Sequence, residues 1–127
     1  MQRPSWDSLK KSWADQYFFE SLSEFINRLH EDRGGQLELL AVFNPLERDE
    51  LIPQRPPIYL LVLYNTEVDF LKERLFLKEH DPSGLFEFFC YSVEAFRNML
   101  RDNNPIALIA RESGLVLFEK GDISERL

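Results

Sequence analysis

Hydrophobic residues in the first part of the chain recur every three or four positions, and this spacing predicts a helix over residues 5–30. Ser5 is a suitable N-cap for it, and Asp7 would lie favourably in its first turn. Gly34 and Gly35 supply the end of the helix. A single helix of this length exceeds the usual globular range, so we expect a break near residues 14–16.

Two nearly continuous apolar runs follow, at residues 36–43 and 58–64. Runs of this kind are typical of strands that are covered on both faces. The segment between them, residues 44–57, is rich in proline and charged residues, so it cannot form a central strand. We expect a loop at the sheet edge, with at most one helical turn at residues 46–51.

The next segment, residues 66–79, gives a mixed signal. Val68, Leu71 and Leu75 have the spacing of one helical face, and Thr66 could act as the N-cap. Residues 75–77 could instead extend a strand. We predict a helix for this segment.

The remaining elements follow one another with little loop, and most have a clear boundary residue. They are a type I turn at residues 81–84, a strand at 85–91, a Ser92-capped helix at 93–102, a helix at 106–112 led by Pro105, a strand at 115–118 and a frayed tail from Gly121. The alternation of helices and strands predicts an α/β (α+β) fold, a mixed β-sheet of about four strands flanked by helices.

The chain length of 127 residues fits one domain with one core. We expect residues 1–127 to form that domain, divided into an N-terminal helical segment (1–35), a body of sheet and helices (36–120) and a tail (121–127). Hydrophobic residues make up 44% of the chain and include 11 Phe, so a disordered chain is excluded and Phe must fill much of the core.

Charge and cysteine content narrow the possible partners and location. The formal net charge of −7 gives a field that repels phosphate backbones, so no nucleic-acid partner is expected. The one cysteine, Cys90, lies in an apolar run and reads as a small buried hydrophobe rather than a nucleophile. No run approaches the roughly 20 apolar residues of a membrane span. We therefore expect a cytoplasmic protein without a membrane partner.

Several short blocks occur in the order found in one known family. They are Phe43-Asn44-Pro45 at the end of the first strand, Pro57-Ile58-Tyr59 at the start of the second, Glu87 on the third, Tyr91-Ser92-Val93-Glu94-Ala95-Phe96 at the next helix, Asn104-Pro105, and Gly114 before the last strand. In this order and spacing the chain resembles the minimal nucleotidyltransferase domain of the DNA polymerase beta superfamily. The resemblance covers about residues 37–120 and implies a nucleotidyltransferase-like fold.

The resemblance also implies where the catalytic groups would lie, and most of them are replaced. The family has a Gly-Ser turn where this chain has Asn44 and Pro45, and an Asp-x-Asp where it has Pro57 and Tyr59. Two-metal chemistry needs several carboxylates, and proline offers no ligand while a tyrosine phenol is a poor one for Mg²⁺. Glu87 alone keeps a carboxylate. We therefore expect no catalytic residue, no bound metal and no cofactor. The five positions that correspond to the family's site are called the remnant site: Asn44, Pro45, Pro57, Tyr59 and Glu87.

The expected function is accordingly noncatalytic, a binding or regulatory module. By resemblance its partner would be a helical protein of the HEPN type, with this chain in an antitoxin-like role, or a second copy of the chain. The aromatic residues of the first helical segment could contribute to such a surface.

Two alternatives remain at this stage. In one, the protein is an active Mg²⁺-dependent nucleotidyltransferase that takes a nucleoside triphosphate through a divergent metal site, built from Glu87 with Glu47, Asp49 or Glu50. In the other, the motif order is a coincidence, and then Asn44, Tyr59 and Glu87 would not converge in space.

Overall fold

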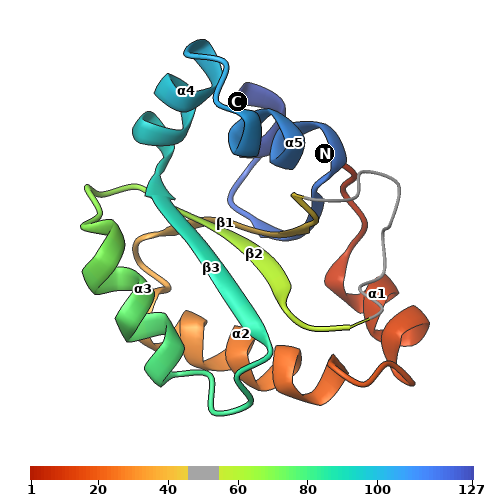
Figure 1. Cartoon of the computed structure of the whole chain (residues 1–127). Coiled ribbons are helices and arrows are strands. Elements are labelled where there is room, and N and C mark those ends of the chain that lie inside the picture. Colours follow the sequence, from red (N-terminus) through yellow and green to blue (C-terminus); the bar gives the residue numbers. More distant parts are fainter. Residues whose placement is uncertain (46–54) are drawn as a thin grey trace.

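A four-stranded mixed sheet lies at the centre of the computed structural model, which describes residues 1–45 and 55–127 (Figure 1). The strands are β1 (Leu37–Phe43), β2 (Ile58–Tyr64), β3 (Phe86–Ser92) and β4 (Leu115–Glu119). Their order across the sheet is β3-β2-β1-β4. β1 runs antiparallel to both β2 and β4, whereas β2 and β3 are parallel. The expected α/β class, a mixed sheet of four strands flanked by helices, is confirmed.

Helices cover both faces of the sheet. Figure 1 shows α2 (Phe19–Arg33) below it and the pair α4 (Val93–Arg101) and α5 (Pro105–Ser113) above it. α1 (Trp6–Trp13) shares the apolar core of α2, and α3 (Phe70–Glu79) packs against β3. Because side chains alternate along a strand, each strand contributes to both cores, which explains the continuous apolar runs in the sequence.

Most helix boundaries lie where local signals predicted them. The long N-terminal helix is broken as expected, with α1 ending at Trp13 and α2 starting at Phe19. Ser5 caps α1, and the Ser92 hydroxyl accepts a hydrogen bond from the Ala95 amide at 3.0 Å. Gly84 donates from its amide to the Asp81 carbonyl at 3.4 Å, as the turn required.

The helix predicted for residues 66–79 starts later and buries a different face. α3 begins at Phe70, and its cap is the Asp69 carboxylate, which accepts from the Lys72 amide at 3.2 Å. Leu71 and Leu75 are 69% and 60% exposed, whereas Leu77 is buried. The expected Thr66 cap was therefore wrong, and the helical face that carries Leu71 and Leu75 is not the buried one. The helix packs against β3 at the edge of the sheet, and this packing decides which of its faces is buried. Residues 66–69 form the connection from β2 to the start of α3.

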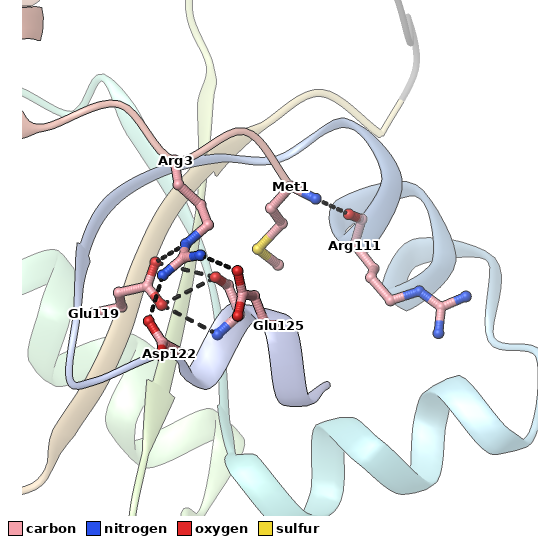
Figure 2. Close-up of polar contacts among 7 residues, drawn as sticks. Met1, Arg3, Arg111, Glu119, Asp122 and Glu125 are labelled. Atoms are coloured by element: carbon pink, nitrogen blue, oxygen red, sulfur yellow. Dashed lines mark hydrogen bonds and ion pairs between the residues drawn. The ribbon is translucent and has the colours of Figure 1, made fainter.

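The tail expected to fray from residue 121 is instead ordered by long-range contacts. It forms a short 3-10 helix, η1 (Ile123–Arg126), and Ile123 is buried. The Arg3 guanidinium reaches three carboxylates there, binding Glu119 at 3.0 Å, Asp122 at 2.7 Å and Glu125 (Figure 2). We call these four residues the Arg3 cluster.

The N-terminal segment also extends the sheet. Gln2 forms a parallel bridge to Leu115, with hydrogen bonds of 2.8 Å to Gly114 and 2.9 Å from Val116. Chain from the opposite end of the sequence thus pairs with the edge of β4 at its beginning. The contacts of Arg3 and Gln2 join sequence positions more than a hundred residues apart, and no local pattern could have predicted them.

The helical turn that we predicted at residues 46–51 lies outside the described residues. None of the helices within 1–45 and 55–127 combines the length and the hydropathy that crossing a membrane requires.

Candidate functional site

The remnant site gathers at one end of three neighbouring strands. Tyr59 on β2 is in register with Glu87 on β3 and with Phe43 on β1. Asn44 and Pro45 directly follow Phe43, and Pro57 stands two residues before Tyr59. The sheet therefore places Tyr59 beside Glu87 and Phe43, with Asn44 one residue beyond Phe43.

Aromatic rings occupy the middle of this region. The centroid of the Phe43 ring lies 6.3 Å from that of Tyr59 and 5.5 Å from that of Phe89, and the Tyr59 and Phe89 centroids are 6.1 Å apart. These three residues belong to the core that α4 and α5 cover, with Tyr59 and Phe89 half-buried. Rings packed in this way present an apolar surface and no oxygen ligand except the Tyr59 hydroxyl.

Glu87 is held by two cations from α3. Arg74 and Lys78 are four residues apart and so lie on one face of the helix, where the Arg74 Nη2 binds Glu87 Oε2 at 2.6 Å and the Lys78 Nζ binds Oε1 at 2.9 Å. Partial burial raises the pKa of the Glu87 carboxyl, but the hydrogen bonds and charges of Lys78 and Arg74 outweigh it and hold this pKa below its usual range. Both carboxylate oxygens are thus engaged in ion pairs.

The described ranges offer no further ligand set for a metal ion. Within residues 1–45 and 55–127, no three His, Cys, Asp or Glu side chains come close enough together to hold one. Glu47, Asp49 and Glu50, the candidates for a divergent metal site, lie outside the described residues.

A second polar cluster, which sequence reasoning missed, lies at the opposite end of β2. The buried Tyr64 hydroxyl donates to Glu73 Oε2, and Arg33 binds the two oxygens of Glu73 at 3.1 and 3.3 Å. A hollow of about 210 Å³ lies beside these residues, and Lys72 also lines it. These residues come from α2, β2 and α3, so nothing in the local sequence links them.

This second cluster has a structural role, because its hydrogen bonds and ion pair hold three elements together. Burial, followed by the hydrogen bond and charge of Glu73, raises the pKa of the Tyr64 phenol far above its usual value, so it stays protonated. Arg33 also lies over the Phe76 ring, 3.8 Å from its centroid. The three residues tie α2, β2 and α3 together.

Cys90 is a small buried hydrophobe, as expected. It is fully buried between the sheet and α3, and its thiol lies 3.7 Å from the Phe70 carbonyl oxygen. Burial, with a further contribution from the Glu73 charge, raises the pKa of Cys90 to about 12. A thiol that stays protonated is a poor nucleophile.

The N-terminal aromatics divide between core and surface. Trp13 and Phe18 are buried, and Trp6 and Phe19 stack at 6.0 Å on the margin of the core. Tyr17 is 47% exposed. Most of these rings therefore pack in or against the core, and Tyr17 is the exposed one among these five.

In comparisons with known proteins, no family model, no curated protein and no solved structure matches this chain.

Proposed function

We propose that this protein is a catalytically degenerate member of the nucleotidyltransferase fold that acts as a binding or regulatory module. The proposal rests on the motif order, on the mixed sheet flanked by helices, and on the convergence of the remnant site at three strand ends.

The single observation that supports the loss of catalysis is the state of Glu87. A carboxylate that is to bind Mg²⁺ must offer free oxygen lone pairs toward the cleft. Here each oxygen already accepts from a cation, Oε2 from Arg74 and Oε1 from Lys78, so a metal ion would have to compete with both ion pairs. Two neighbouring cations also repel a divalent ion at close range.

The neighbouring strand supports the same proposal. Tyr59, directly beside Glu87, contributes a ring to an aromatic cluster, and Pro57 has no side-chain ligand to offer. A pair of metal ions would need carboxylates at these places.

The partner that we propose is a helical protein of the HEPN type, with this chain in an antitoxin-like role. This part rests on the family resemblance. Exposed apolar side chains at two places, Tyr17 in the turn between α1 and α2 and the pair Leu71 and Leu75 on α3, offer contact area for a partner or for a second copy.

Co-expression with a small all-helical protein encoded beside this chain tests the proposal. We expect a complex of fixed stoichiometry by sedimentation, and no transfer of label from α-³²P nucleoside triphosphates and Mg²⁺ to either protein. The Glu87→Gln variant should form the same complex. Label transfer that the wild type supports and Glu87→Gln abolishes would contradict the proposal, and so would the absence of any complex.

A further inference from the structure

Three arginines line one shallow hollow on the helical face opposite α2. Arg97 and Arg101 are four residues apart on α4 and so share one side of that helix, and Arg111 comes from the last turn of α5. Their hollow has a volume of about 410 Å³, and its other lining residues are Leu100 and Leu127. We call it the arginine hollow.

The three guanidinium groups form no ion pair with acidic side chains of residues 1–45 and 55–127. In the part of the chain that the structure describes, Arg97, Arg101 and Arg111 form no ion pair, and Arg101 donates only to the Asn98 amide oxygen. All three are exposed. Figure 2 shows the Arg111 side chain extending away from the Arg3 cluster and its carboxylates.

Helix dipoles explain only part of this arrangement. Arg101 and Arg111 stand in the last turns of their helices, where a cation is favourable. Arg97 lies a turn earlier on α4 and has no such role. The convergence of the three is also unusual against a net charge of −7, because acidic residues outnumber basic ones in the chain by 22 to 15.

We propose that the arginine hollow is the docking site for an acidic helix of a partner protein. The charge complementarity is direct, since three unpaired cations favour carboxylates on the facing surface. Leu100 and Leu127, together with the aliphatic stems of the arginines, form an apolar floor that suits a leucine-type anchor. Arginine is also the charged residue most enriched at protein interfaces.

The shape of the hollow and the overall charge favour a protein over the other anionic partners. The hollow lies open on the surface between two helices, whereas small molecules usually bind in clefts that bury most of their surface. A long phosphate backbone would meet the repulsion of the remaining acidic surface. An acidic helix touches only the local patch.

This inference rests on the proposed role as a binding module and names a surface for it. The test uses a fluorescent helical peptide of about 20 residues that carries leucines on one face, flanked by glutamates. A second peptide has glutamine in place of each glutamate, and a single-stranded oligothymidylate of similar charge represents a nucleic acid. Binding is followed by fluorescence anisotropy at low salt and again at high salt.

We expect the glutamate peptide to bind with an affinity that falls with salt, and the glutamine peptide to bind at least about tenfold more weakly. The double variant Arg97→Glu with Arg101→Glu should lose about tenfold or more in affinity. The double variant Lys11→Glu with Lys72→Glu makes the same change in net charge at two exposed sites elsewhere, and it should stay within about twofold of wild type because only local charges act strongly.

A conservative variant separates the guanidinium group from its charge. Arg97→Lys with Arg101→Lys should retain part of the affinity, because lysine keeps the charge but loses the planar donor pair. Since all the substituted side chains are exposed, we expect the variants to fold, which circular dichroism verifies.

Three results would overturn the proposal. In the first, wild type and the Arg97→Glu/Arg101→Glu variant bind the glutamate peptide equally. In the second, the oligothymidylate binds more tightly than the glutamate peptide. In the third, the wild-type protein self-associates and the Arg97→Glu/Arg101→Glu variant does not. None of them bears on nucleotide transfer, so the docking proposal and the loss of catalysis can fail separately.

Discussion

At the scale of single residues, the environment of Glu87 decides what its carboxylate can do. In isolation a glutamate on a strand next to a tyrosine could be a metal ligand, a base or a surface charge. Arg74 and Lys78 fix it as the centre of an ion-pair group between β3 and α3. The pairing accounts for the lowered pKa of the Glu87 carboxyl.

This lowered pKa makes a prediction about stability and pH. A group whose pKa is lower in the folded than in the unfolded state stabilises the fold above its unfolded value, about 4.3 for Glu. That contribution is lost as the pH falls through the folded pKa. We expect the free energy of unfolding of Glu87→Gln, measured by urea titration between pH 6 and pH 3, to fall less steeply than that of wild type.

The difference should be about 1 kcal/mol or less, because the Glu87 side chain is 32% exposed and water screens its ion pairs. Glu79→Gln is the control, since it removes an exposed carboxylate at the C-terminal end of α3 that forms no ion pair among the described residues. A Glu87→Gln curve that parallels wild type over the whole pH range would show that the ion pairs contribute nothing.

At the scale of secondary-structure elements, sequence patterns predicted those elements whose boundaries are set locally. β2 is bounded as predicted because proline precedes it and a continuous apolar run fills it. α4 begins at its Ser92 cap. α3 differs because its start and its buried face depend on where β3 lies, and Asp69 supplies a cap at the place where packing lets the helix begin.

The two candidate caps of α3 give a direct comparison. Asp69→Ala should lower the free energy of unfolding by about 1 kcal/mol, because the Lys72 amide loses its acceptor. Thr66→Ala should change it by less than about 0.5 kcal/mol, since Thr66 is exposed and lies outside the helix. Chemical denaturation followed by tryptophan fluorescence measures both, and the opposite ranking would mean that α3 begins at Thr66.

The Arg3 cluster predicts a coupling between the two ends of the chain. Arg3→Ala removes the cation that joins Glu119, Asp122 and Glu125, leaving three carboxylates close together. We expect faster amide hydrogen exchange in η1 and in β4, measured by mass spectrometry.

Arg126→Ala serves as its control. Arg126 lies on the same 3-10 helix and forms no ion pair among the described residues, so its removal should leave exchange in β4 unchanged. If Arg3→Ala exchanges as slowly as wild type, the buried Ile123 and the hydrogen bonds of Ser124 to Glu119 hold the tail in place without Arg3.

At the scale of the whole molecule, the sequence predicted the fold class better than it predicted the site. The alternation of apolar runs and capped helices was sufficient for the four strands and their flanking helices. The motif order also indicated which positions would gather. What it could not predict was that α3 would place two cations on Glu87, or that Arg97, Arg101 and Arg111 would meet in one hollow, because both depend on how distant helices pack.

The distribution of charge is also a property of the whole molecule. The chain has a net charge of −7, yet three arginines line the hollow between α4 and α5. The net charge describes long-range repulsion and does not reveal such a local group of cations.

Isothermal titration calorimetry with ATP and Mg²⁺ examines whether the remnant site can assemble metal ions and nucleotide, which our proposed function denies. We predict no saturable heat for wild type, and the same trace for Glu87→Gln. Mg²⁺-dependent binding of ATP that is present in wild type and lost in Glu87→Gln would contradict the proposed function.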